Sequence, residues 1–312
     1  MDVFRDVGAI PADLGPTAVT LGNFDGVHLG HRAVLGTLAR AARARGLRSL
    51  AITFDPHPLQ VHRPGDAPAT ISGPVVKTSR MAATGIDAVL VQHYTLDFAA
   101  QTPREFVVDF LIGRLGARYV AVGADVRFGT DNSGDLHTLQ ELAAEHDLEV
   151  DVIDEVGEGH RWSSTEIRGL VAAGEVARAA QLLGEPHTLV GEVVHGDARG
   201  REMGFPTANL SPAGEGMVPA DGVYAGWVSF TGTAGRFPAA VSVGTNPTFD
   251  GHERRVEAHA IGVDFAGFDV YGSTMTLQFV ARIRGQVTFT GMEALVERMH
   301  QDVTEVMEVL EA

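Results

Sequence analysis

The feature that most constrains the fold of this 312-residue chain is a change of hydrophobic pattern near residues 184–188. Before this point short apolar strands alternate with helices, starting with a strand at 17–24 and a helix that stops at Gly46. Such alternation predicts a parallel, Rossmann-like α/β sheet with helices on both faces. Beyond it, short strands separated by Gly and Pro turns predict an antiparallel β-barrel. We therefore expect two domains, residues 1–184 and 186–312.

Two helices are expected beside the barrel pattern. One should begin with Ser164 or Thr165 as its N-cap and run to Leu183, where the sequence GEP ends it. The other is a C-terminal helix within 291–312, with apolar residues at helical spacing. An apolar stripe of this kind favours packing against its own domain, and a partner-binding helix is the alternative.

Composition excludes several classes of function. Forty acidic against 24 basic residues give a net charge of −16, a field that repels nucleic acids and anionic membranes. A local pocket can still bind one nucleotide at short range. The absence of cysteine excludes disulfides and thiolate catalysis. No segment approaches the roughly 20 apolar residues of a membrane span. We expect a cytoplasmic monomer or weak homo-oligomer, with no nucleic-acid or membrane partner.

The segment LGNFDGVHLGHR, residues 21–32, lies where the first predicted strand leads into the first helix. Parallel α/β sheets bind ligands at such junctions. His28 and His31 are three residues apart, so both rings are expected to face one ligand, and the helix start adds unpaired amides. This is a phosphate site, and His-x-Gly-His is typical of nucleotidyltransferases that attack the α-phosphate of ATP. The alternatives are incidental surface histidines and, with no third ligand evident, a metal site.

The segment SSTEIR, residues 163–168, is expected at a second junction of loop and helix. Ser164, Thr165 and Arg168 could hold a triphosphate together with helix amides. The alternative is a capping box, with Ser163 as cap and Glu166 three residues on. Paired with His-x-Gly-His upstream, the segment completes the two phosphate clamps of a nucleotidyltransferase.

The segments TFDPHP and VGADVRFGTDNSGD, residues 53–58 and 122–135, are expected at the ends of strands that face the same crevice. With these motifs, and with Lys77 in the expected pattern, residues 15–183 resemble the FMN adenylyltransferase half of prokaryotic bifunctional riboflavin kinase/FAD synthetases. The resemblance implies that FMN attacks the α-phosphorus of ATP while His28, His31 and Arg168 stabilise the charge. The nucleotide-binding residues that it implies are Gly22, Asn23, Phe24, Asp125, Arg127, Ser164 and Thr165.

The segment GEVVHGDARGREMGFPTANL, residues 191–210, is a predicted strand and a glycine-rich loop that ends in Pro-Thr-Ala-Asn. It lacks the lysine of a P-loop and is similar to riboflavin kinases. In that family Thr207 and Asn209 would hold Mg²⁺ and phosphate, a choice that fits the ion's preference for oxygen. A plain turn is the alternative. The nucleotide-binding residues implied for this half are Gly196, Arg199 and Gly200.

Glu257 falls where riboflavin kinases have their catalytic carboxylate. The resemblance implies that Glu257 accepts the proton of the riboflavin 5′-hydroxyl, whose oxygen then attacks the γ-phosphate of ATP. A solvated strand residue opposite Arg254 or Arg255 is the alternative. The chain departs from the family pattern in a loop about three residues longer between Glu257 and Tyr271, and at three positions: Glu185, His187 and Gln286.

The sequence therefore predicts an enzyme that phosphorylates riboflavin to FMN in its C-terminal half and adenylylates FMN to FAD in its N-terminal half. ATP is the co-substrate in both, and Mg²⁺ is the expected cofactor. The rival interpretations are a nucleotidyltransferase with another acceptor beside a degenerate barrel, and a non-catalytic flavin or nucleotide sensor. A tRNA-binding relative of the aminoacyl-tRNA synthetases is opposed by the net charge of −16.

Overall fold

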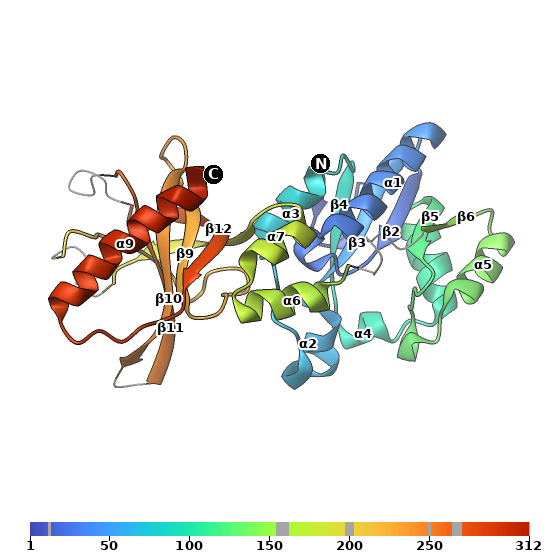
Figure 1. The fold of residues 1–312 in the computed structure, drawn as a ribbon. Helices are drawn as coiled ribbons and strands as arrows, with labels where there is room; N and C mark the ends of the chain where they lie inside the picture. Colours follow the sequence, from blue (N-terminus) through green and yellow to red (C-terminus); the bar gives the residue numbers. More distant parts are fainter. Residues whose placement is uncertain (12–13, 154–161, 197–202, 249–250, 264–269, 312) are drawn as a thin grey trace. The chain divides into compact units, whose positions relative to one another are not determined.

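A computed structural model describes the chain in six stretches: residues 1–11, 14–153, 162–196, 203–248, 251–263 and 270–311 (Figure 1). The chain divides into two compact units. The N-terminal unit comprises residues 1–68 and 77–162, and the C-terminal unit comprises residues 69–76 and 163–312.

The N-terminal unit is built on a six-stranded parallel sheet, as the alternating pattern predicted. In spatial order its strands are β1 (Asp2–Phe4), β4 (Ala88–His93), β3 (Arg48–Asp55), β2 (Thr17–Leu21), β5 (Ala117–Gly123) and β6 (Glu149–Ile153). Only β1 was not expected, because three residues are too few to carry a periodic signal.

Helices cover both faces of this sheet. Helix α1 (Leu29–Arg45) lies on one face, and η4 (Glu105–Arg114), which is wound as a π-helix, and α5 (Leu136–Glu145) lie on the other. The unit also contains α2 (Pro58–His62), α4 (Leu96–Ala99) and the part of α3 (Pro74–Ala82) from residue 77 on. Successive strand residues point to opposite faces, so Ala18 packs in the core beneath α1 and Val19 in the core beneath η4 and α5. Burial of both faces explains the nearly continuous apolar strands.

The C-terminal unit contains a closed antiparallel barrel, also as predicted. In spatial order its strands are β10 (Phe237–Thr248), β11 (Gly251–Ala260), β8 (Ala208–Leu210), β7 (His187–Val194), β12 (Thr274–Arg284) and β9 (Gly222–Phe230). Along β11, Val256 and Ala258 are buried in the barrel core, so Glu257 and His259 lie on the outer face. The short strand β8 was not expected, because three residues carry no periodic signal and they had been assigned to the end of the glycine-rich loop.

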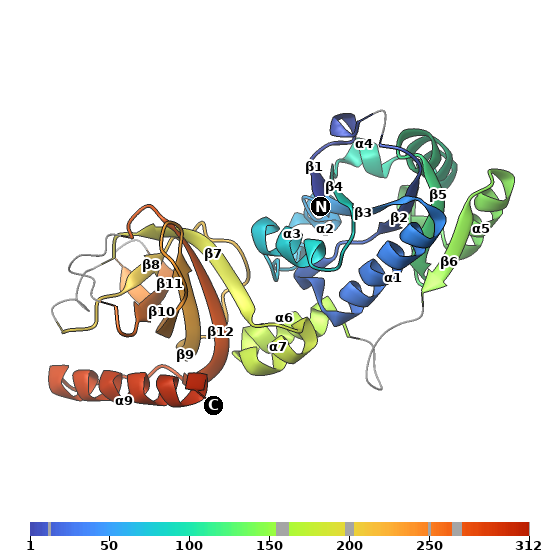
Figure 2. The ribbon, with the colours of Figure 1, turned by 90° about the horizontal axis from the view of Figure 1, so that it is seen from above.

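Three helices accompany the barrel: α6 (Ser164–Ala173), α7 (Val176–Leu183) and α9 (Met292–Glu311). The expected single helix up to Leu183 was wrong, because Gly174 ends α6 in the left-handed conformation, with φ of 77°. Its N-cap is Ser163, whose side chain accepts the N–H of Glu166, so the expected N-caps Ser164 and Thr165 were wrong. Helix α9 lies along the barrel (Figure 2), so the apolar stripe packs against its own unit. In the described part of the chain, no helix has the length and apolarity needed to cross a membrane.

Candidate active sites

The loop between β2 and α1 has an unusual backbone. Phe24, Gly26 and Val27 have φ angles of 46°, 79° and 45°, in the left-handed region. For a non-glycine residue this conformation costs about 1–3 kcal/mol, so it persists only where the surrounding structure determines it. The side chains of Phe24 and Val27 are buried in the core beneath α1, and this burial offsets the cost. The loop thereby places His28 at the start of α1.

His28 and His31 lie together at the start of α1, as their spacing predicted. Their rings are stacked, with centroids 3.7 Å apart and planes 20° apart. His28 is the N-cap, and its Nδ1 accepts the N–H of His31 at 3.3 Å. The N–H of His31, one of the helix amides expected to bind a ligand, therefore donates to the His28 side chain instead. Because Nδ1 accepts, a neutral His28 carries its proton on Nε2.

A lysine reaches the same loop through a threonine. Lys77 Nζ donates to Thr53 Oγ1 at 2.6 Å, and that hydroxyl donates to the carbonyl of Asn23 at 3.0 Å. Burial lowers the pKa of Lys77 to about 8, and the carboxylates of Asp25 and Asp55 offset part of this shift. The family pattern includes Lys77 but gave it no role, and Thr53 was not singled out.

A cavity of about 430 Å³ opens at the loop that follows β2. Four residues predicted to bind nucleotide contribute to its wall: Gly22, Asn23, Asp125 and Arg127. Aromatic side chains that the sequence analysis missed form much of the rest: Phe54, Tyr94, Phe98, Phe106 and Phe128. They come from separate elements, so no periodic pattern joins them. Phe24 does not line the cavity, because its side chain packs in the core beneath α1.

Ser164, Thr165 and Arg168 lie in the first turns of α6, in the C-terminal unit. The capping by Ser163 is present in the structure, and a ligand role for the three residues stays a prediction. Arg168 Nε donates to the carbonyl of Ala69 at 2.8 Å, within the same unit. The histidine pair belongs to the other unit, so joint action of the two clamps also stays a prediction.

A second cavity, of about 280 Å³, lies between the outer face of the barrel and α9. Its lining combines polar groups of the strands with apolar side chains of the helix. It consists of Met203, Phe205, Thr207, Asn209, Val223, Ala240, Ser242, Glu257, His259, Arg284, Gln286, Phe289, Leu295, Met299, Asp302 and Val303.

Three residues predicted for the kinase chemistry meet at the wall of this cavity. Glu257 and Asn209 are direct neighbours across the β11–β8 pair, and Thr207 Oγ1 donates to Glu257 Oε2 at 3.4 Å. Gly196 lies so close to the Asn209 side chain that a Cβ there would collide with it. The glycine predicted to bind nucleotide therefore lies beside a predicted metal ligand.

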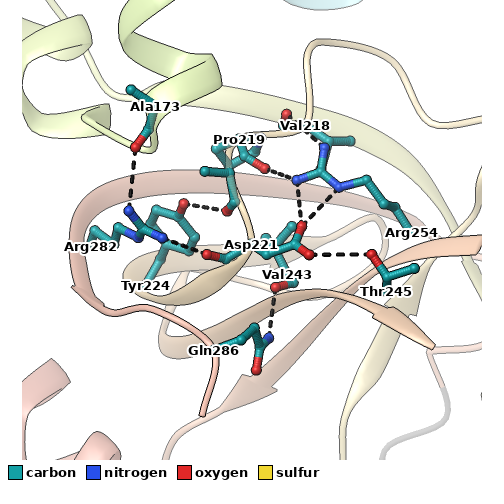
Figure 3. Close-up of polar contacts among 11 residues, drawn as sticks. Ala173, Val218, Pro219, Asp221, Tyr224, Val243, Thr245, Arg254, Arg282 and Gln286 are labelled. Carbon is teal, nitrogen blue, oxygen red and sulfur yellow. Dashed lines mark hydrogen bonds and ion pairs between the residues drawn. The ribbon is translucent and has the colours of Figure 1, made fainter. Parts of the chain in front are cut away.

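Arg254, one of the two arginines considered as an ion-pair partner of Glu257, pairs with Asp221 instead. Its Nε and Nη2 reach Asp221 Oδ1 at 3.0 and 2.8 Å (Figure 3). The departure at Gln286 has a local reason as well. Its amide donates to the carbonyl of Val243 at 2.8 Å, a bond that a carboxylate could not make.

His259 is a further residue that the sequence analysis missed. It lies two residues after Glu257, on the same face of β11, and this spacing was the available signal. Its Nδ1 donates to the carbonyl of Pro206 at 2.8 Å, which ties the Pro-Thr-Ala-Asn segment to β11. Burial lowers the pKa of His259 and so favours its neutral form. By contrast, His187 is fully buried, with Nε2 at 2.7 Å from the carbonyl of Met217.

Two predicted nucleotide-binding residues, Arg199 and Gly200, lie outside the described residues. Residues 264–269 of the longer segment between Glu257 and Tyr271 also lie outside the described residues.

Fold and sites together define an ATP-using transferase with two reaction centres: a nucleotidyltransferase-like α/β sheet and a kinase-like barrel. The FAD synthetase family model matches residues 10–166, and the riboflavin kinase family model matches residues 183–310. The chain belongs to the family of bifunctional riboflavin kinase/FMN adenylyltransferases.

Relatives with that name match nearly the whole chain. The protein of Escherichia coli K12 is 36% identical over 286 residues, which cover 91% of this chain and 90% of the relative. The protein of Bacillus subtilis is 32% identical over 304 residues, which cover 95% of this chain and 93% of the relative. A crystal structure described as a macrolide-efflux protein from Streptococcus pneumoniae is 31% identical, covers 98% of both chains and has a TM-score of 0.85. That description is a statement about the Streptococcus protein alone.

Proposed function

We propose that the barrel phosphorylates riboflavin with ATP, giving FMN and ADP, and that the parallel-sheet unit then transfers the adenylyl group of a second ATP to FMN. The observation that carries the first activity is the meeting of Thr207, Asn209 and Glu257 at one cavity wall. Apolar side chains of α9, such as Leu295 and Met299, complete a cavity suited to a flat ring with a polar chain.

Glu257 is the base of the kinase step. It accepts the proton of the riboflavin 5′-hydroxyl while the hydroxyl oxygen bonds to the γ-phosphorus of ATP. The bond from that phosphorus to the bridging oxygen breaks, and ADP leaves. An alcohol is a weak nucleophile until its proton is removed, so a base within hydrogen-bond reach, here Glu257, favours this reaction.

Thr207 and Asn209 are the residues that would hold Mg²⁺. A hydroxyl oxygen and an amide oxygen, next to the carboxylate of Glu257, form the oxygen-rich set that this hard ion prefers. When bound together with ATP, the ion neutralises charge on the phosphate oxygens. His259 holds the Pro-Thr-Ala-Asn segment in place through the carbonyl of Pro206.

In the N-terminal unit a phosphate oxygen of FMN attacks the α-phosphorus of ATP, and the bond to the β-phosphate breaks to release pyrophosphate. The FMN phosphate is already ionised, so no base is needed. His28 and His31 stabilise the charge that builds on the phosphoryl oxygens. Arg168, which belongs to the C-terminal unit, stays a predicted further cation. The stacked histidine pair and the aromatic cavity at the same loop support this assignment. The flavin ring fits the aromatic wall.

Separate assays test the two activities. The chain with riboflavin, ATP and Mg²⁺ should yield FMN and FAD, and with FMN in place of riboflavin it should yield FAD and pyrophosphate. The His28→Ala/His31→Ala variant should lose only FAD formation, and Glu257→Ala only FMN formation. Wild-type chain that forms neither product would refute the proposal, and loss of both activities in either variant would indicate misfolding.

The remaining parts of the proposal concern organisation. The two activities divide near residues 184–186, and Mg²⁺ serves both. The partners are riboflavin, FMN and ATP, with neither nucleic acid nor membrane. The enzyme acts in the cytoplasm, where ATP is available, as a monomer or weak homo-oligomer. Light scattering of the purified chain at several concentrations, with and without substrates, tests the last point.

A further inference from the structure

Lys77 is the only lysine of the chain, since the other 23 of its 24 basic residues are arginines. Where this protein needs a cation in an ion pair it uses arginine, as in the pair of Arg284 with Asp302. A lysine differs by its compact ammonium, which carries three donors on a flexible stem instead of a rigid planar fork. The exception at residue 77 points to a place where a small, point-like donor is required.

The surroundings of Lys77 show what that donor does. Its ammonium donates to Thr53 Oγ1 at 2.6 Å, and the hydroxyl passes a hydrogen bond on to the carbonyl of Asn23 at 3.0 Å. Thr53 is only 2% exposed, so water cannot readily replace either bond. One turn further along α3, Arg80 Nη1 donates to the carbonyl of Gly26 at 2.9 Å. Side chains of α3 thus fix two carbonyls of the loop that leads to His28, Arg80 directly and Lys77 through Thr53.

That loop needs such support. Phe24 and Val27 are non-glycine residues in the left-handed region, with φ of 46° and 45°, and such residues persist only when their surroundings determine the conformation. The loop ends at His28, which caps α1 and stacks on His31. Relaxation of the loop would therefore move the groups proposed to meet the phosphates.

We propose that Lys77 is a positioning residue for adenylyl transfer, which acts through Thr53 on the loop from Asn23 to His28. The inference rests on the adenylyltransferase function proposed above. Lys77 orders the loop before substrate binds, so its loss should slow the chemical step more than it weakens substrate binding. A shift of about 1 Å in a catalytic group can lower a rate about 100-fold.

Variants of the full-length chain test this role. Thr53→Val removes the hydroxyl at nearly constant volume, Thr53→Ser keeps it, and Lys77→Met removes the ammonium. For FAD formation we expect kcat to fall about 10- to 100-fold in Lys77→Met and Thr53→Val, with KM for FMN and ATP within about threefold of wild type. Thr53→Ser should keep most of the activity. FMN formation from riboflavin by the same samples should be unchanged, which controls for the folded fraction.

The double variant Lys77→Met/Thr53→Val should be no slower than Lys77→Met alone, because both changes break one relay. Wild-type kcat in Lys77→Met, equal losses in Thr53→Ser and Thr53→Val, or multiplied losses in the double variant would each overturn the inference. Should Lys77→Met unfold its unit, the Thr53 pair decides, since both of those variants keep Lys77. A wild-type chain that makes no FAD would instead overturn the proposed function.

Discussion

The two proposed reaction centres use the same co-substrate with opposite chemical means. The N-terminal centre places the stacked rings of His28 and His31 at one loop, which Lys77 supports through Thr53, so its groups are hydrogen-bond donors. The C-terminal centre places the carboxylate of Glu257 beside the oxygens of Thr207 and Asn209. The difference follows from the nucleophile: an FMN phosphate arrives ionised and needs its charge stabilised, whereas a riboflavin hydroxyl must first lose a proton.

The two scaffolds also offer their sites in different places. Parallel strands end together at one edge, so loops such as Asn23–His28 meet there. The closed barrel has a filled interior, and its cavity lies on the outer face, where α9 supplies the opposite wall. A parallel sheet can thus build a site from its own loops, while the barrel needs an added helix.

The largest effect is expected from removing the base of the kinase step. Glu257→Gln keeps the shape of the side chain and loses its ability to accept a proton. FMN formation should fall about 10²- to 10⁴-fold, while FAD formation from supplied FMN stays at the wild-type rate. Product separation with each flavin measures both. An equal fall in the rates of FMN and FAD formation would contradict the assignment of Glu257 to the kinase centre alone.

The matching change in the N-terminal centre is His28→Ala. Loss of one group that stabilises transition-state charge should lower kcat for FAD formation about 10²- to 10³-fold and leave riboflavin phosphorylation intact. His137→Ala is the matched control, because that side chain is 78% exposed on α5. Equal rates of FAD formation in His28→Ala and His137→Ala would show that His28 has no part in the reaction.

The third change concerns the helix that only the barrel site requires. Arg284 donates to both carboxylate oxygens of Asp302, at 2.8 and 2.7 Å, and thereby fastens α9 to β12. Asp302→Asn leaves the largely buried guanidinium of Arg284 poorly paired, which should destabilise the C-terminal unit by about 3 kcal/mol and raise KM for riboflavin. Chemical denaturation and kinetics measure the two effects.

Glu305→Gln is the control for that change, because it breaks only the more exposed pair of Glu305 with Arg298. It should cost less than about 1 kcal/mol. A Glu305→Gln cost that matches that of Asp302→Asn would show that the buried ion pair has no special part in holding α9.

The smallest effect is a difference in pH dependence. The pKa of Lys77 is lowered from 10.5 to about 8 by burial, with Asp25 and Asp55 facing it. If the ammonium is the working form, FAD formation should decline as pH rises through about 8, by up to about tenfold per unit. Between about 8 and 10.5 the unfolded chain binds more protons at this residue, so its contribution to stability rises with pH. The decline therefore cannot come from unfolding caused by Lys77.

The kinase centre contains no lysine, so FMN formation should lack this decline. With one lysine in the chain, protein labelled with [¹³Cε]lysine should give a single side-chain signal whose titration midpoint is near 8. A midpoint near 10.5, or the same decline in both activities, would break this part of the comparison.

The sequence predicted the features that depend on local pattern. Alternating strands and helices, the spacing of His28 and His31, and the place of Glu257 on its strand were all readable from neighbouring residues. Features that arise only when distant segments meet were not, such as the cavity wall that joins Phe54 to Phe128 and the relay from Lys77 to Thr53. Strands β1 and β8 were too short to give a periodic signal.

Helix ends were predicted less well than helices. The segment from Ser164 or Thr165 to Leu183 was expected to be one helix because its apolar spacing continues across Gly174. There α6 ends in the left-handed conformation, and a Cβ at Gly174 would lie 2.7 Å from the Tyr224 hydroxyl. Gly174, which lies within an amphipathic pattern, thus ends the helix, and its lack of a Cβ leaves room for the Tyr224 side chain of the barrel.

The destination of each phosphorus atom of ATP tests most directly whether the chain houses two centres with opposite chemistry. With [γ-³²P]ATP and riboflavin, label should appear in FMN; with [α-³²P]ATP and FMN, label should appear in FAD. The Glu257→Gln chain should lose the first transfer and keep the second. Label from the γ-position entering the flavin when FMN is the substrate, or loss of both transfers in a folded Glu257→Gln chain, would contradict two separate centres.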